Sequence, residues 1–278
     1  MPFLDYTRRV CCIHHNLTMI SSDMVFIGID PTSAQKSFTF AVLNRDLQLL
    51  ALADGDIEDI PALLADFRSA VAAINAPSSV NRGLVRAKIR KEMVKQHQIR
   101  GAELRLAEYE LRERGIAVSG TPANEAVCPG WMRLGFELFR KLEKMGFKTF
   151  PENGAGRQMM ETHPHACFCV MSGGSPLSKP SLEGRLQRQL LLHDHGLRIN
   201  DPMDFFEEIT RYKLAKGIWP MELLYLPEQL DALVASYTAW LAVNKPEKVI
   251  SIGDEQEGRI VLPVVKLKEK YQSYNIES

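Results

Sequence analysis

The feature that most constrains the fold is a set of three short β-like segments near the start of the chain. They cover residues 25–29, 37–43 and 47–53, and short connectors separate them. Connectors of this length predict antiparallel neighbours, because a parallel pair needs a crossover of about a dozen residues or more. The second segment alternates large apolar side chains with smaller ones, which is typical of a half-buried strand. The chain is therefore expected to begin with an antiparallel three-stranded unit.

Helical and β-like segments alternate after this unit. Helical spacing covers residues 57–71, roughly 83–114 (with a stop at Gly115), 130–147 and 227–245. Further strands are expected at 72–80, 116–120 and Met159–Thr162, and a closing pair of β-like runs covers 248–253 and 258–265. This order predicts an α/β protein with a mixed sheet, antiparallel at first and then parallel, flanked by helices.

Composition excludes several classes of protein. Acidic and basic residues balance at 34 each, which argues against coating a duplex or a membrane by bulk charge. No apolar run approaches the ~18–20 residues of a membrane span. The five cysteines (Cys11, Cys12, Cys128, Cys167 and Cys169) show neither disulfide-framework nor zinc spacing. They predict buried, reduced thiols and a cytoplasmic location.

The domain organisation is expected to be simple. Residues 1–23 are interpreted as a poorly ordered extension that is dispensable, with Met24 as an alternative start. Residues 24–278 are interpreted as a single domain, and polar helical material around 173–226 as an insertion in it. The sequence leaves the oligomeric state open, with a homodimer as one candidate.

Asp30 is an acidic residue at the end of an otherwise apolar strand. Burying a carboxylate is costly unless it is paired, protonated or bound to a cation. In open α/β sheets the ligand crevice lies outside the carboxyl ends of the strands, so we expect Asp30 to face such a crevice. An Asx turn over the following residues is the alternative explanation.

Two other carboxylates have a comparable placement. Glu161 precedes His163 and His165, which lack the i, i+4 spacing of a zinc-binding helix. Asp231 lies in the strongest predicted helix, on a face of small side chains that continues to Ala242 and would allow close packing. The alternatives are an exposed strand end for Glu161 and a favourable charge near a helix N-terminus for Asp231.

Together, Asp30, Glu161 and Asp231 predict a metal site. Carboxylates ~4 Å apart repel by about 4 kcal/mol at an effective dielectric of 20, a cost that Mg²⁺ or Mn²⁺ would offset. Such ions stabilise the attacking and leaving oxygens of a phosphoryl displacement. The three carboxylates are therefore candidate catalytic and metal-binding residues, and His163 is a candidate for proton transfer.

A basic segment follows the strand predicted at 72–80. The candidates for contact with nucleic-acid phosphates are Arg82, Arg86, Lys88, Arg90 and Lys91. A solvated helix face is the alternative explanation. Few aromatic residues lie nearby to stack bases, so the segment does not distinguish DNA from RNA.

In these features the chain resembles the DUF429 proteins, described as predicted nucleases with an RNase H-like, resolvase-like fold. The matching motifs are "GIDPT", "AAINAPSSV", "RLAEYELRERGI", "METHPHA", "LDALVASYTAWL" and "IGDEQEGRIVLPV", in order over residues 24–265. The resemblance implies a mixed five-stranded sheet flanked by helices. It also implies metal-dependent catalytic roles for Asp30, Glu161 and Asp231, and supporting roles for Arg105 and Glu108. The alternative for the last two is an exposed helix with paired charges.

One residue departs from the family pattern: Asn75 stands where the family has an aspartate. A neutral amide gives the site one negative charge fewer and weakens metal binding. Two functions therefore stay open, a nuclease that uses Mg²⁺ or Mn²⁺ and a non-catalytic nucleic-acid-binding protein. An ATP-binding phosphotransferase is a third hypothesis, disfavoured because the chain lacks a second strand-Asp-Gly-Thr/Ser unit.

Overall fold

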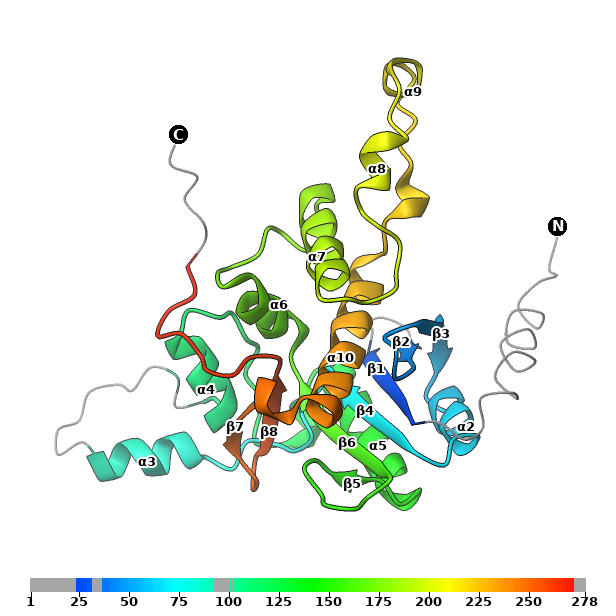
Figure 1. Ribbon diagram of the computed structural model, residues 1–278. Coiled ribbons are helices and arrows are strands. Elements are labelled where there is room, and N and C mark those ends of the chain that lie inside the picture. The colour runs from blue at the N-terminus through cyan, green and yellow to red at the C-terminus, as the bar shows by residue number, and fades with distance from the viewer. Residues whose placement is uncertain (1–23, 32–36, 93–100, 102, 273–278) are drawn as a thin grey trace.

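The computed structural model describes residues 24–31, 37–92, 101 and 103–272 (Figure 1). Its centre is an eight-stranded sheet in the order β3-β2-β1-β4-β6-β8-β7, with the short β5 paired to β6. The strands are β1 (Val25–Pro31), β2 (Ser37–Leu43), β3 (Leu49–Asp56), β4 (Ala70–Ile74), β5 (Lys148–Thr149), β6 (Arg157–Thr162), β7 (Ile250–Asp254) and β8 (Gly258–Leu262).

The predicted strand arrangement is confirmed. β1, β2 and β3 form an antiparallel unit, and β1, β4, β6 and β8 are parallel neighbours. The five strands β3-β2-β1-β4-β6 have an RNase H-like topology. The sheet is larger than the five strands expected, because the predicted closing pair, β7 and β8, joins its far edge and β5 adds a short strand.

Helices cover both faces of the sheet (Figure 1). They are α2 (Asp59–Ala65), α3 (Leu84–Glu92), α4 (Leu106–Glu113), α5 (Gly130–Lys144), α6 (Pro164–Ser172), α7 (Leu182–Asp194), α8 (Asp204–Glu207), α9 (Arg211–Ala215) and α10 (Pro227–Asn244), with 3-10 turns η1 (Glu125–Val127), η2 (Met221–Leu223) and η3 (Pro246–Lys248). Alternate residues of β1 enter two cores, because successive side chains of a strand point to opposite faces. One core includes α4, α6 and α10, and the other includes α2 and α5.

The helix α10 packs on β1 at unusually short range. A Cβ on Gly28 would lie 1.9 Å from the carbonyl oxygen of Ala232 and 2.3 Å from the backbone nitrogen of Ser236. The glycine in the strand and the small residues in the helix therefore let the two backbones meet. The close approach predicted from the small residues of this helix is confirmed, and it carries Asp231 towards the end of β1.

The structure differs from the sequence-based expectation in several segments. The helix expected over 57–71 ends at Ala65, and the strand expected over 72–80 is β4, which begins at Ala70 and ends at Ile74. The helix expected over roughly 83–114 is divided, with α3 ending at Glu92 and α4 starting after Arg105, whose backbone is extended. Residues 116–120 form no strand. Cys167 and Cys169, spaced like strand residues, lie in α6, because Pro164 suits the first turn of a helix and the ring of His163 caps it through the Ala166 N–H.

Other expectations fall partly outside the described residues. The extension at 1–23, with Cys11 and Cys12, lies outside them. Cys128, Cys167 and Cys169 are buried and form no disulfide, as predicted.

The segment expected to form a helical insertion contains α7, α8, α9 and η2. In the described part of the chain, every helix is too short or too polar to cross a bilayer.

Candidate active site

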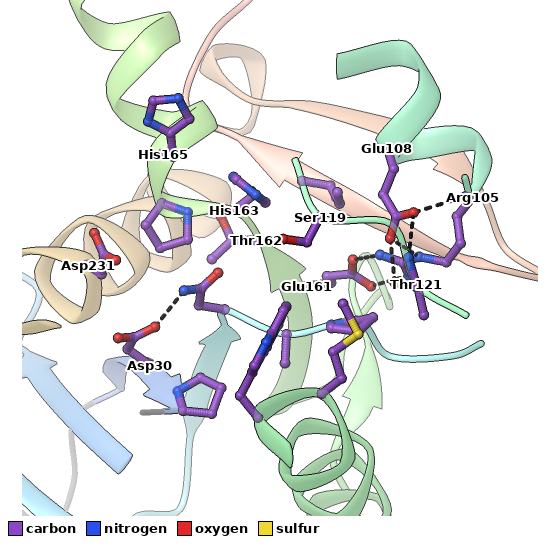
Figure 2. Close-up of a pocket in the computed structure, with 18 of the residues that line it drawn as sticks. Asp30, Arg105, Glu108, Ser119, Thr121, Glu161, Thr162, His163, His165 and Asp231 are labelled. Carbon is purple, nitrogen blue, oxygen red and sulfur yellow. Dashed lines mark hydrogen bonds and ion pairs between the residues drawn. The ribbon is translucent and has the colours of Figure 1, made fainter. Parts of the chain in front are cut away.

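A cavity of about 560 Å³ lies at the carboxyl ends of β1, β4 and β6 (Figure 2). Asp30 lies at the end of β1 and Glu161 near the end of β6, while Asp231 enters from α10. All three predicted carboxylates line this cavity. The crevice expected at the carboxyl ends of the strands is therefore present, and it brings together residues that are far apart in the sequence.

Asp30 is held by the residue that follows β4. The backbone N–H of Asn75 donates to the Ile29 carbonyl oxygen at 2.8 Å, which extends the β1–β4 pairing by one step. This places the Asn75 side chain beside Asp30, and its amide nitrogen donates to Oδ1 at 2.5 Å. Burial, with the nearby charge of Asp231, raises the pKa of Asp30 to about 7, although the Asn75 hydrogen bond opposes the shift.

Asp231 is paired with a lysine that was not among the residues predicted for the site. Lys179 lies between α6 and α7, and its Nζ is 2.5 Å from Oδ2 of Asp231. Burial raises the pKa of Asp231 even though the ammonium group lowers it. The Lys179 side chain keeps 39% of its surface exposed, so this cation is at the mouth of the site rather than sealed within it. Lys179 lies in a polar stretch without helical or strand periodicity, so no sequence pattern distinguished it.

Glu161 has different surroundings from the two aspartates. Its Oε2 accepts hydrogen bonds from Nη1 of Arg105 at 3.0 Å and from the Ser78 backbone N–H at 2.8 Å. Its Oε1 accepts a short hydrogen bond from Nη2 of the same guanidinium group. Both carboxylate oxygens are therefore occupied by donors of the protein itself.

Arg105 is the centre of a buried charge network. Besides Glu161 it contacts Glu108, whose Oε1 accepts from Nε at 2.8 Å and whose Oε2 accepts from the Arg105 backbone N–H at 3.0 Å. Glu108 also accepts from the hydroxyl and the backbone N–H of Thr121. Burial by itself would lower the pKa of Arg105, but the carboxylates of Glu161 and Glu108 raise it above its ordinary value. The alternative of an exposed helix for Arg105 and Glu108 is therefore wrong.

Glu257, in the turn between β7 and β8, extends this network. It is fully buried, and its carboxylate accepts from the backbone N–H groups of Arg82, Leu84 and Leu106, at 2.7, 3.1 and 2.9 Å. One carboxylate therefore fixes the N-termini of both α3 and α4, where negative charge is favoured. No sequence pattern marks Glu257 as a functional residue, because it stands among other polar turn residues.

Burial lowers the pKa of both histidines that follow β6. His163 Nδ1 accepts a hydrogen bond from the Ala166 backbone N–H at 3.2 Å, so the neutral ring carries its proton on Nε2. Burial and the neighbouring His165 lower the pKa of His163 to about 4. Both rings line the cavity. His163 is therefore arranged to donate a hydrogen bond rather than to take up a proton.

Three of the predicted basic residues lie apart from the cavity. Arg82, Arg86 and Lys88 are exposed and do not line it. Arg90 and Lys91 lie in α3, but their side chains are outside the described part of the structure. In Figure 1, α3 extends away from the sheet. Contact with nucleic acid through this helix stays a prediction.

The donor set at the cavity fits one divalent cation better than two. Among the described residues, no group of three or more His, Cys, Asp or Glu side chains is arranged to hold a metal ion. Mg²⁺ is commonly bound by one or two protein carboxylates, with water and substrate phosphate completing its shell. Asp30 and Asp231 match that smaller set, whereas Glu161 already accepts hydrogen bonds at both oxygens. A metal bound by all three carboxylates stays a prediction.

One of the comparisons with known proteins identifies the family of the chain. The chain matches the family model "Protein of unknown function (DUF429)" over residues 28–258, which confirms the family resemblance. The comparison with curated proteins gave no significant match, and neither did the comparison with solved structures. The family description assigns no activity, so the functional argument depends on the site.

Proposed function

We propose that this chain, which belongs to the DUF429 family, is a metal-dependent phosphodiesterase that acts on nucleic acid. The observation that supports this most is the carboxylate pair of Asp30 and Asp231. Both side chains are buried, both line one cavity, and both have a raised pKa. A divalent cation would offset their repulsion and is the ligand that this chemistry favours.

Each residue around the pair has a role in this proposal. Asp30 and Asp231 hold one Mg²⁺ or Mn²⁺ ion, and Asn75 fixes the orientation of Asp30 through its amide. When bound, such an ion lowers the pKa of a coordinated water and withdraws charge from a phosphoryl oxygen. Lys179 exchanges its contact with Asp231 for a substrate phosphate oxygen. The Nε2–H of His163 donates a hydrogen bond to the same phosphoryl group.

Glu161 has a positioning role in the proposal, not a ligand role. Through Arg105 it joins the end of β6 to the start of α4 and to the turn that follows β7. This network supports one wall of the cavity, which Arg105, Glu108 and Thr121 also line. The exposed basic residues of α3 would contact the backbone of a longer substrate outside the cavity.

The dimensions of the cavity suggest the form of the substrate at the scissile bond. A volume of about 560 Å³ is within the usual range of small-ligand pockets, roughly 300–1,000 Å³. It would admit a nucleotide unit but not a duplex, so we expect cleavage of single-stranded or unpaired segments. Trp131 lines the same cavity and offers a face on which a base can stack.

The test is calorimetric titration of Mn²⁺ into the wild type and into Asp30→Asn and Asp231→Asn. These substitutions keep the size of each side chain, and Asp66→Asn on the exposed end of α2 is the matched control. We expect binding by the wild type and the control and none by the two cavity variants. Cleavage of single-stranded, duplex, hybrid and branched nucleic acids with Mn²⁺ is then measured on the same proteins.

A second candidate function follows from Asn75. Because its amide holds Asp30 where the family has an acid, the site has one negative charge fewer, which favours a non-catalytic nucleic-acid-binding protein. Salt-dependent binding of an oligonucleotide without cleavage, in a protein that binds no Mn²⁺, would support this second function and contradict the first.

A further inference from the structure

The segment between α7 and α10 projects from the body of the protein (Figure 1). Residues 201–224 of this segment, with α8, α9 and η2, are called the arm below. Phe205 of α8 is buried and stacks on Trp219 with a distance of 6.2 Å between ring centroids. Lys213 of α9 pairs with Glu208 at 2.6 Å. The arm is therefore held together by its own contacts while it extends away from the sheet.

The surface of the arm and its junction with α10 is apolar to an unusual degree. Eight of the twelve exposed large apolar side chains of the described residues lie within 203–226. Among them, Phe206, Tyr212, Leu214, Ile218 and Trp219 are between 44% and 70% exposed. A buried aromatic covers about 150–250 Å², so the eight side chains together, each about half exposed, offer roughly 600–800 Å². Monomeric proteins rarely expose a contiguous apolar patch of more than a few hundred Å².

Charge is divided along the arm. Residues 201–208 carry four acids and no base, and residues 211–216 carry three bases and no acid. When two such arms lie antiparallel about a two-fold axis, the acidic half of each faces the basic half of the other. A two-fold interface requires this kind of self-complementarity, because the same patch is used on both subunits.

We propose that the arm is a self-association surface through which two copies of this chain form a dimer. The apolar area that each arm offers is close to the ~800 Å² per partner of a stable interface. The division of charge fixes the antiparallel orientation and favours a second copy over other partners. Nucleic acid fits less well, because the five acids of the arm outnumber its three bases and would repel the phosphates.

The test uses the full chain and two charge-reversal variants. Asp204→Lys with Glu207→Lys removes the net negative charge of residues 201–208, and Arg211→Glu with Lys216→Glu makes residues 211–216 net acidic. We expect the wild type to have twice the 31.4 kDa chain mass by light scattering, with dissociation on dilution in the micromolar range. Each variant alone is expected to be monomeric, because the two halves of its arm then no longer carry opposite net charges. An equimolar mixture of the two is expected to restore the dimer mass.

An apolar pair of variants tests the same surface independently of charge. Leu214→Ser in the arm is expected to weaken dimerisation by about tenfold or more. Leu177→Ser, at a side chain of similar exposure outside the arm, is expected to leave it unchanged. Since these side chains are exposed, circular dichroism and thermal unfolding should match the wild type. A monomeric wild type, or a dimer that persists in both charge variants, would overturn the proposal.

Discussion

The side-chain nitrogen of Asn75 donates a 2.5 Å hydrogen bond to Oδ1 of Asp30, across the ends of two adjacent parallel strands. An aspartate at position 75 could not make this bond in its ionised form, because a carboxylate only accepts. The amide therefore changes more than the charge of the site. It stabilises ionised Asp30 in a place where burial and Asp231 favour protonation.

We expect Asn75→Asp to lower the free energy of unfolding and to raise the affinity of the site for Mn²⁺. Loss of a hydrogen bond to a charged group costs about 2 kcal/mol, and a third carboxylate adds repulsion. The free energy of unfolding without metal should fall by at least that amount at pH 8. The loss should be smaller at pH 6, where one shared proton can replace the amide hydrogen. Chemical denaturation at the two pH values, followed by Mn²⁺ calorimetry, measures both effects. Asn75→Asp with unchanged stability and unchanged Mn²⁺ affinity would show that the residue lies outside the metal site.

The raised pKa of Asp30 predicts a pH dependence of stability. Its ordinary value is 3.8 and its value in the fold is about 7, so between pH 4 and pH 7 the folded protein keeps a proton that the unfolded chain has lost. Raising the pH through this window therefore lowers the free energy of unfolding, by at most about 1.4 kcal/mol per pH unit for one group. Asp30→Asn removes this contribution. The free energy of unfolding, measured in urea from pH 4 to pH 8, should fall less for the variant than for the wild type. An equal fall in the two proteins would contradict the raised pKa of Asp30.

Lys179 is expected to compete with a divalent cation for Asp231. Replacing it by methionine removes the ammonium group 2.5 Å from Oδ2, so Asp231 no longer has a cation that competes with a metal ion. Mn²⁺ affinity at pH 8 should rise by no more than about tenfold, because Lys179 is partly exposed and solvent screens its charge. Calorimetry compares this variant with Lys148→Met, an exposed lysine of β5. A loss of affinity in the Lys179 variant alone would instead mean that Lys179 supports the metal site.

The sheet could be predicted from the sequence because its signals are local. Connector lengths after Pro31 and Leu43 fixed the antiparallel start, and strand runs between helices indicated parallel pairs. The break between α3 and α4 could not be predicted in this way. It depends on Arg105, which has extended backbone so that its guanidinium group meets Glu161. That contact joins residues far apart in the chain, and helical periodicity carries no information about it.

The candidate site was predictable in part for a similar reason. Asp30 and Glu161 lie at strand ends, and the small residues of α10 indicated close packing, so geometry alone placed these carboxylates near one crevice. Lys179 and Glu257 have no such pattern, because each reaches its partner from an irregular segment. The ion pair of Glu161 with Arg105 could not be predicted either. A glutamate at this position is equally compatible with an ion pair and with a metal contact, so the residue type does not distinguish them.

Removing the charge of Glu161 should mainly reduce stability, whereas removing the charge of Asp231 should mainly reduce Mn²⁺ binding. Glu161→Gln breaks a buried pair with Arg105 and should lower the free energy of unfolding by about 3 kcal/mol, while the folded variant still binds Mn²⁺. Asp231→Asn should abolish Mn²⁺ binding with a smaller effect on stability, because it removes a carboxylate with a raised pKa. Thermal unfolding and calorimetry on both proteins make the comparison. If Glu161→Gln lost Mn²⁺ binding and kept its stability, Glu161 would be a metal ligand.

Gly28 is expected to be the strand position least tolerant of a side chain. A Cβ there would lie 1.9 Å from the Ala232 carbonyl oxygen, and backbone atoms cannot move aside as the end of a flexible side chain can. Gly28→Ala should therefore push α10 from the sheet and cost at least about 3 kcal/mol, the upper end of the usual range for overpacking.

Because α10 carries Asp231, Gly28→Ala should also weaken Mn²⁺ binding in the fraction that stays folded. Gly130→Ala is the matched control, since Gly130 lies at the start of α5 with nothing within 4 Å of its added Cβ. That variant should unfold at or slightly above the wild-type temperature, because alanine favours a helix more than glycine does. Equal unfolding temperatures for the two variants would mean that α10 does not need its close contact with β1, and that some other contact positions Asp231 beside Asp30.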